Sequence, residues 1–366
     1  MKRLIGIAAL LVLAIATWLW RAELLRLVPT SFLPIPAHEQ YATALTITGV
    51  ASSEAGRAWL AAAEDALDHP REASTWFSAN GQFDASPSSA IAWRFPARRG
   101  QRVTIGLATT GGTLFLDLFT EDKTRVASAA PGAAVLSYVV EHDGPLIARA
   151  QPPLPVPDTT PWRSGSESPR LSALEYDVTQ QVEASLEFPV SGMDRRAVGS
   201  SFGVARDAGR RRHEGVDIFA PRRTPAIAAV DGWVTRQTTN RLGGKVVWLW
   251  APSRRLSLYY AHLDEQAVTP GERVAAGDVI GYVGNTGNAR HTAPHLHFGV
   301  YLALAGAVDP FPFIVDPVRD ARRAGPAAPP RHAILWDPPR NARRPEPETR
   351  SPLHKPLRVL SLLTQP

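Results

Sequence analysis

The sequence predicts a mainly β protein with an N-terminal membrane helix, a small β-sandwich, a second domain built on an antiparallel β-sheet, and an irregular tail rich in proline and arginine. Short β-prone runs separated by glycine turns fill two regions of the chain. Prolines gather between and after these regions, where they favour linkers. The expected units are a membrane segment (1–21), a neck (22–44), a helix with the sandwich (45–150), a linker (151–185), the second β domain (186–315) and the tail (316–366).

The composition sets limits on the function. Of the 366 residues, 44% are hydrophobic and 20% are charged, which is typical of folded globular domains. The chain has 40 Lys and Arg residues against 34 Asp and Glu, and a net charge of +6 is too small to indicate a dedicated nucleic-acid binder. Cysteine is absent, which excludes disulfides, thiol nucleophiles and thiolate zinc sites. Any metal site must therefore use His, Asp or Glu.

The first residues predict an envelope location. An apolar run, Leu4–Trp20, stands between Lys2-Arg3 and Arg21, and at about 1.5 Å per residue it is long enough to cross a bilayer core. The basic N-terminal flank orients the body outside the cytoplasm, anchored in the inner membrane and facing the periplasm or other extracytoplasmic space. A second interpretation stays open, because Ala14–Ala16 has the small-x-small form of a signal-peptide cleavage site. Cleavage near Ala16 would release a secreted protein.

The first β domain begins with a helix. Residues 53–68 read as an amphipathic helix, with Trp59, Ala63 and Leu67 on one face. Four β-prone runs follow between Trp76 and Ala150, and turn-forming residues separate them. These runs are 91–95, 103–107, 114–119 and 136–140.

Histidines in three contexts mark the second β domain. His213 and Asp217 are four residues apart and project to one side of the backbone in either an extended or a helical segment. His295 and His297 are two apart, which places them on the same face of a strand. His262 ends a third β-prone run. Taken singly, each is also explained by a chance pair or a structural histidine; together, imidazoles and a carboxylate favour a zinc site with acid-base partners.

In order, the motifs His-x-x-x-Asp, Tyr-x-His and His-x-His resemble the lysostaphin/LytM-type zinc endopeptidases that cut bacterial cell-wall peptides. The resemblance covers about residues 187–314 and implies a LytM-like peptidase fold there. It implies that His213, Asp217 and His297 bind one Zn²⁺ ion and that His262 and His295 are catalytic. Spacing alone does not distinguish His295 from His297 as the ligand. Further matching segments are 188–192, 201–203, 229–234, 271–287 and 308–310.

Two positions depart from the family pattern. The usual glycine before Pro-His is Ala293, and an acidic residue often found after His-x-His-Phe is Gly299. Neither position supplies a metal ligand, so we expect the departures to affect substrate fit. Other candidates for substrate contact are His291, the arginine run 210–212 and the aromatic residues Trp233, Trp248, Trp250, Tyr259 and Tyr260.

The resemblance implies a zinc-dependent endopeptidase that hydrolyses peptide cross-links of peptidoglycan through a metal-activated water. Two alternatives are a non-catalytic LytM-like regulator of another wall hydrolase and a zinc peptidase that acts on secreted proteins. The expected partners are the peptidoglycan peptide, the membrane through the N-terminal helix, and envelope proteins, with no nucleic acid. The turn 99–101 and the strand 114–119 resemble the pre-peptidase sandwich modules found beside secreted bacterial proteases.

Overall fold

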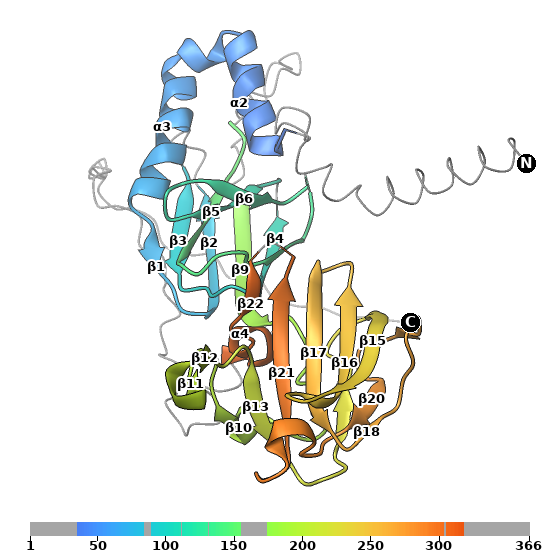
Figure 1. The fold of residues 1–366 in the computed structure, drawn as a ribbon. Helices are drawn as coiled ribbons and strands as arrows, with labels where there is room; N and C mark the ends of the chain where they lie inside the picture. Colours follow the sequence, from blue (N-terminus) through green and yellow to red (C-terminus); the bar gives the residue numbers. More distant parts are fainter. Residues whose placement is uncertain are drawn as a thin grey trace, which may run out of the picture.

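A computed structural model describes residues 35–83, 89–110, 112–130, 132–154, 174–303 and 305–317 (Figure 1). It confirms a mainly β protein whose second half is an antiparallel sheet domain. The expected membrane segment (1–21) and nearly all of the expected tail (316–366) lie outside the described residues. Within the described ranges, no helix has the length and apolar character needed to cross a bilayer.

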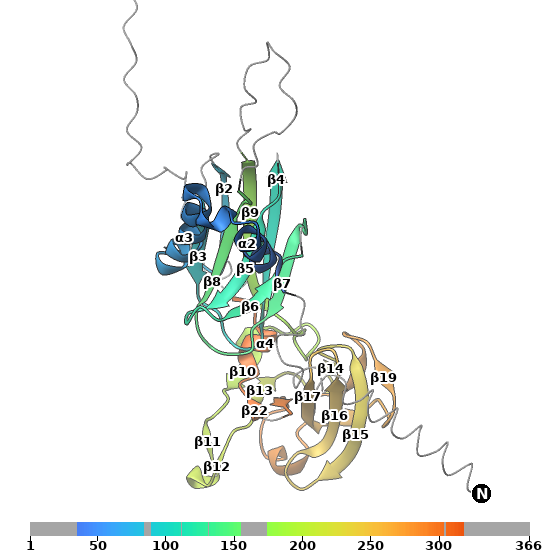
Figure 2. The ribbon, with the colours of Figure 1, turned by 90° about the horizontal axis from the view of Figure 1, so that it is seen from above.

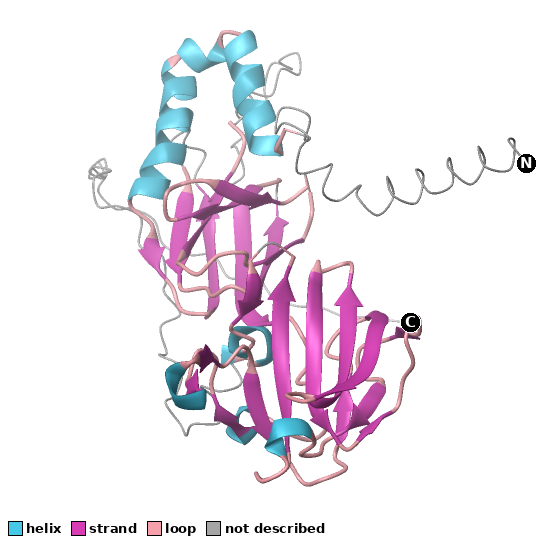
Figure 3. Cartoon of the chain, in the orientation of Figure 1, coloured by secondary structure: helices cyan, strands magenta, loops and turns pink. Residues whose placement is uncertain are grey.

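Two helices form a hairpin on one end of the sandwich (Figure 3). They are α2 (Ala37–Ile47) and α3 (Glu54–Asp68), joined through a short 3-10 turn, η2 (Val50–Ser52). The prediction of a neck over residues 22–44 is therefore wrong in its last part, because residues 37–44 belong to α2. The prolines of the neck end at Pro36, directly before the first helical residue, where a missing N–H does no harm. The expected helix over 53–68 is confirmed, and Ser53 is its N-cap, accepting a hydrogen bond from the Gly56 amide at 3.0 Å.

The sandwich itself consists of two sheets that pack face to face and share one apolar core. One sheet has the strand order β1-β3-β8-β5-β6 and the other β2-β9-β4-β7. All pairs are antiparallel except β1 with β3. Their bounds are β1 Arg71–Glu72, β2 Trp76–Phe83, β3 Ile91–Phe95, β4 Gln101–Thr110, β5 Phe115–Thr120, β6 Arg125–Ser128, β7 Val135–Val139, β8 Leu146–Gln151 and β9 Leu174–Ala184.

Strand β9 corrects the expected linker. Residues 151–185 were expected to join the two domains, yet 174–184 lies between β2 and β4 in the second sheet. The physical reason is a period-two pattern: Leu174, Tyr176 and Val178 are buried in the sandwich, and the residues between them are exposed. Residues 155–173 lie outside the described part of the chain.

The second domain is built on one antiparallel sheet with the strand order β10-β13-β21-β17-β16-β15-β19. Strand β22 pairs with the last residues of β21, on the same side as β13. A smaller sheet, β14-β20-β18, and the helix α4 complete it. The bounds are β10 Val198–Ser200, β11 Ala205–Arg206, β12 Arg211–Arg212, β13 Val216–Phe219, β14 Pro225–Ile227, β15 Gly232–Asn240, β16 Gly244–Ala251, β17 Leu256–Leu263, β18 Glu265–Gln266, β19 Arg273–Val274, β20 Val279–Tyr282, β21 His295–Leu302, β22 Gly306–Val308 and α4 Phe311–Ile314. Strands β11 and β12 form a hairpin that projects from this domain (Figure 2).

The sandwich joins the second domain almost directly. Only Ser185 separates β9 from Leu186, whose amide donates to the Phe313 carbonyl at 2.8 Å. The Phe313 ring lies so close to Gly100 that a Cβ there would stand 2.3 Å from a ring carbon. Arg98 also reaches across to Asp309 at 3.1 Å. The two domains therefore meet through packed side chains as well as through the chain itself.

Candidate active site and metal centre

Two neighbouring strands bring the first and last histidine motifs together. Strands β13 and β21 pair antiparallel, and Asp217 stands directly opposite His297. Side chains of directly opposed residues share one face, with Cβ atoms about 5 Å apart. His213 lies just before β13, and Gly215 between them lets the chain approach the His297 ring, because a Cβ there would lie 2.8 Å from it. Local chain path and strand register therefore create the cluster.

The three predicted ligands converge. His213 Nε2 lies 2.9 Å from His297 Nδ1 and 3.0 Å from Asp217 Oδ1, and His297 Nδ1 lies 3.0 Å from the same oxygen. His213 Nδ1 donates a hydrogen bond to the Ser201 carbonyl at 2.8 Å. The ring proton is therefore on Nδ1, and Nε2 has a lone pair directed at the cluster. Two imidazoles and a carboxylate so arranged fit a divalent cation such as Zn²⁺. No other such cluster was found in the described part of the chain.

Burial and mutual contact shift the pKa values in this cluster. Burial alone would raise the pKa of Asp217, but the close contacts with the His213 and His297 imidazoles outweigh it and hold that pKa well below its ordinary value. Burial lowers the pKa of His297 in spite of the attraction of Asp217. The carboxylate is therefore ionised and the His297 imidazole neutral near pH 7, which is the protonation that metal binding requires.

Arg206 contacts the cluster and was not anticipated from the sequence. Its Nη2 donates to Asp217 Oδ2 at 2.6 Å and to the Ser200 hydroxyl at 2.7 Å. The guanidinium therefore occupies one carboxylate oxygen and leaves Oδ1 facing the histidines. Arg206 lies on the β11–β12 hairpin, and no spacing signal in the sequence connects that hairpin to Asp217.

The other two predicted residues lie beside the cluster. The rings of His262, on β17, and His295, on β21, have centroids 5.0 Å apart, and the His262 ring is 5.9 Å from that of His297. Each ring is fixed through Nδ1: His262 to the Thr286 carbonyl at 2.9 Å and His295 to the Ala293 carbonyl at 2.8 Å. In a neutral ring, these hydrogen bonds place the proton on Nδ1. Each Nε2 therefore carries a lone pair and is available as a proton acceptor.

His262 sits in an unusual local environment. Burial, followed by repulsion from His295 and His297, lowers the pKa of His262 to about 4. Its backbone φ is 62°, a left-handed conformation that is uncommon for residues other than glycine and that surrounding contacts must stabilise. His262 is therefore neutral near pH 7 and held in a fixed place.

All five residues line one cavity of about 560 Å³. An aromatic wall stands beside them, in which the Trp248 ring lies 4.5 Å from that of Tyr259 and 5.0 Å from that of Tyr301. Arg211 is the member of the arginine run that borders the cavity. The remaining candidates for substrate contact, His291, Arg210, Arg212, Trp233, Trp250 and Tyr260, are not among its lining residues.

The two departures from the family pattern have local explanations. The backbone carbonyl of Ala293 holds His295, and this role needs no particular side chain. At Gly299 a Cβ would lie 2.9 Å from the Tyr301 ring and 3.1 Å from the Glu214 carbonyl. Tyr301 also donates a hydrogen bond to the Glu214 carboxylate at 3.3 Å. An acidic side chain at 299 would therefore displace the ring that forms part of the cavity wall.

Comparisons with known proteins agree with this site. Residues 211–310 match the model of Peptidase family M23. The peptidoglycan DD-endopeptidase ShyC of Vibrio cholerae is 38% identical over 112 residues, which are 30% of this chain and 25% of that protein. The L-Ala–D-Glu endopeptidase of Bacillus subtilis is 33% identical over 138 residues, 35% of this chain and 42% of that protein. The chain thus spans between a quarter and about two fifths of these relatives' length.

Among solved structures, the catalytic domain of lysostaphin from Staphylococcus simulans is 33% identical; the match covers 31% of this chain and 89% of that one, with a TM-score of 0.29. The family model begins at Arg211 and ends at Pro310, so it contains all five predicted site residues. The part of the chain that carries the His and Asp cluster, residues 211–310, is a Peptidase family M23 domain.

Proposed function

We propose that the protein is a zinc-dependent endopeptidase that hydrolyses peptide cross-links of bacterial peptidoglycan. The observation that carries the proposal is the convergence of His213, Asp217 and His297, with His262 and His295 beside them, on one cavity. The names of two relatives, a peptidoglycan DD-endopeptidase and an L-Ala–D-Glu endopeptidase, support the substrate class.

In this proposal, His213, Asp217 and His297 would hold the ion through the atoms that face one another, His213 Nε2, Asp217 Oδ1 and His297 Nδ1. When bound, Zn²⁺ supplies a Lewis acid that lowers the pKa of water towards about 7 and polarises a peptide carbonyl. Arg206 keeps the second oxygen of Asp217 occupied, so the carboxylate contributes a single donor atom.

His262 and His295 share the proton transfers. A neutral His262, with Nδ1 bound to the Thr286 carbonyl, accepts the proton of the attacking water at Nε2. The ring is then a cation, and it returns a proton to the departing amine. His295, whose Nδ1 is bound to the Ala293 carbonyl, presents Nε2 to the same space. With a proton taken up there from solvent, the ring would donate a hydrogen bond to the oxygen on which negative charge develops and would keep that proton through the step.

The aromatic wall and Arg211 supply the substrate contacts. Trp248, Tyr259 and Tyr301 offer flat apolar surfaces to a peptide backbone, and Arg211 adds a positive charge at the rim.

We place the protein in the cell envelope, anchored in the inner membrane with its body in the periplasm or another extracytoplasmic space. The basis for this location is the Leu4–Trp20 run. Membrane fractionation with N-terminal sequencing of the mature protein separates a retained anchor from cleavage near Ala16.

The decisive test incubates the purified full-length protein with isolated peptidoglycan, with and without a chelator, and identifies new amino termini by mass spectrometry. We expect new termini that disappear with chelator and return when Zn²⁺ is restored. Metal binding without new termini, combined with stimulation of another wall hydrolase, would favour a regulator instead. Cleavage of unfolded proteins in place of wall peptides would favour a peptidase for secreted proteins.

A further inference from the structure

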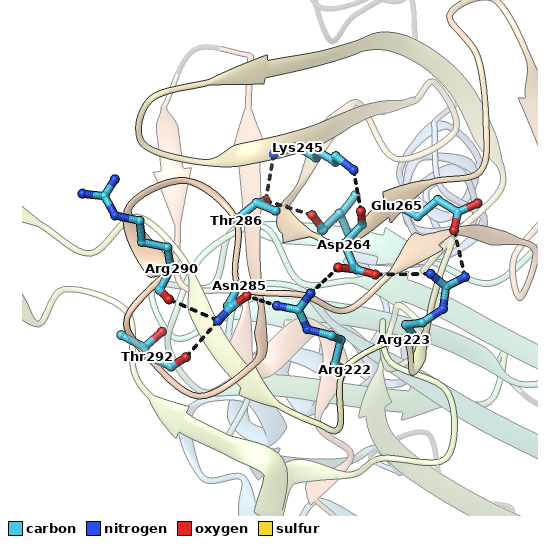
Figure 4. Close-up of polar contacts among 10 residues, drawn as sticks. Arg222, Arg223, Lys245, Asp264, Glu265, Asn285, Thr286, Arg290 and Thr292 are labelled. Carbon is cyan, nitrogen blue, oxygen red and sulfur yellow. Dashed lines mark hydrogen bonds and ion pairs between the residues drawn. The ribbon is translucent and has the colours of Figure 1, made fainter.

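The chain that leads into His295 is shaped by one side chain. Residues 286–292 line the cavity through Asn288, Ala289 and Thr292. The Asn285 side-chain amide donates to the carbonyl of Arg290 at 3.4 Å and to that of Thr292 at 3.2 Å (Figure 4). This amide therefore joins the start of the loop to its end, where the Thr292 N–H and hydroxyl also donate to the Ala289 carbonyl at 2.9 and 2.8 Å.

The same loop fixes the His262 ring. The Thr286 carbonyl accepts the hydrogen bond from His262 Nδ1, and the Thr286 hydroxyl donates to the Leu263 carbonyl at 2.8 Å. The hydroxyl also accepts from the Lys245 amide at 3.0 Å, while Lys245 Nζ reaches the Asp264 carbonyl at 2.6 Å. The position of the loop and the orientation of His262 are thus determined by the same contacts.

Arg222 connects the loop to the strand end that carries His262. Arg222 Nη1 donates to Asp264 Oδ1 at 2.7 Å, and its Nη2 donates to Asn285 Oδ1 (Figure 4). Asp264 follows His262 by two residues, and its carboxylate is mostly buried, with 18% of the side chain exposed. The guanidinium fork is therefore a bridge between the two segments that place the two catalytic candidates. Arg222 itself, in the β13–β14 connection, is not among the cavity-lining residues.

We propose that Arg222 is a positioning residue: through Asp264 and Asn285 it holds the loop 286–292 in the form that orients His262 and His295. The proposal rests on the proposed function, since it assigns Arg222 a role in that reaction. A planar fork suits this bridge, because two donors in fixed geometry can hold a carboxylate and an amide oxygen together. The point charge of a lysine cannot reproduce both contacts.

The chain contains its own matched control. Arg223 is the next residue, is similarly exposed, and binds the same carboxylate at Oδ2 (3.3 Å) together with Glu265 (2.9 Å). Its guanidinium contacts Asp264, Glu265 and the Tyr282 ring, and none of these residues belongs to the loop. Removing either guanidinium therefore deletes one positive charge beside Asp264, and only Arg222→Met breaks the bridge to the loop.

The experiment compares full-length Arg222→Met, Arg222→Lys and Arg223→Met in zinc content, steady-state cleavage of a cross-linked wall peptide, and backbone amide exchange. Misplacement of reacting groups by a fraction of an ångström lowers rates sharply, so we expect Arg222→Met to lower kcat about tenfold to a hundredfold, with KM and zinc content nearly unchanged. Its Asn288 and Thr292 amides should exchange faster than in the parent. Arg222→Lys should recover part of the lost kcat, and Arg223→Met should resemble the parent.

Three outcomes would overturn the role of Arg222: equal losses of kcat in Arg222→Met and Arg223→Met, a rise in KM with unchanged kcat, or unchanged exchange in the loop. Asn285→Asp is an independent check, because it keeps an oxygen for Arg222 but removes the amide donors to Arg290 and Thr292. It should loosen the same amides. The exchange comparison does not depend on turnover, so an inactive parent protein would count against the proposed function alone.

Discussion

The sandwich and the M23 domain each bury a polar cluster, and the two clusters are built in opposite ways. In the sandwich, Arg149 on β8 pairs with Asp117 on β5 at 2.9 Å, with 4% and 2% of the side chains exposed. The Ser128 hydroxyl donates to the second Asp117 oxygen at 2.6 Å. In the M23 domain, the donor atoms of His213, Asp217 and His297 converge on a common point.

The difference separates a structural cluster from a functional one. Arg149 and Asp117 have opposite charges, and each neutralises the other; burial nevertheless lowers the pKa of the Arg149 guanidinium. The His and Asp cluster has lone pairs that are best satisfied by a cation from outside the chain. Mutations should therefore change folding stability at the first cluster and metal content or catalysis at the second.

The largest expected effect distinguishes the two kinds of histidine within the M23 domain. His295→Ala should retain zinc and lower kcat by about 10²- to 10⁴-fold, the usual cost of losing a general acid-base group. His213→Ala should lose the metal and with it the activity. Metal analysis and wall-peptide cleavage on both proteins check this, with His291→Ala as the control outside the cavity. Equal zinc loss in His295→Ala and His213→Ala would contradict the division of roles.

The next effect belongs to the sandwich. Asp117→Ala leaves Arg149 buried without its counter-ion, and we expect the free energy of unfolding to fall by about 3–5 kcal/mol. Zinc content of the folded protein should not change. Urea denaturation measures the loss, and the double variant Asp117→Leu/Arg149→Met should recover most of it. A loss of zinc in folded Asp117→Ala would mean that the two clusters are coupled.

A smaller effect is expected at Arg206. Arg206→Ala frees the second oxygen of Asp217, and loss of such an outer contact typically lowers metal affinity about 10- to 100-fold. Arg211→Ala removes a charge from the same hairpin without touching Asp217, so it should leave the zinc affinity near that of the parent. Competition with a chromogenic chelator measures both. Unchanged affinity in Arg206→Ala would show that Asp217 is held without the guanidinium.

The smallest effect is again in the accessory half. Ser53→Ala removes the N-cap of α3 and should lower stability by about 1 kcal/mol. Cleavage rate and zinc content should stay at parental values, because the α2–α3 hairpin lies on the sandwich, outside the M23 domain. Thermal unfolding with an activity assay tests this, and a changed KM would reveal a substrate-binding role for the hairpin.

Much of the site could be predicted because its information is local. Short motifs on β-prone runs identified His213, Asp217, His262, His295 and His297, and strand pairing then brought them together. The sequence alone left His295 and His297 equivalent. The distances place the His297 ring in the cluster with His213 and Asp217, and the His295 ring beside that of His262. Their assignment as ligand and catalyst remains a prediction.

What could not be predicted depends on long-range contact or on conflicting local signals. Arg206 reaches Asp217 only in the folded protein, where the hairpin that carries it lies beside the cavity. Strand β9 does alternate in the sequence, but the prolines before it dominated the interpretation of 151–185. In the same way, prolines before α2 obscured a helix in the expected neck.

The place of β9 also dictates where the protein can be divided. A truncated chain that begins after the prolines, at Leu171, would carry β9 without β2 and β4, and both of its edges would be open to pairing with other molecules. A cut at Ser185 leaves every sheet whole and exposes the surface where the two domains met, which includes the Gly100–Phe313 contact and the Arg98–Asp309 pair. Trimming to isolate the M23 domain should therefore follow the strand boundary and ignore the proline-rich stretch.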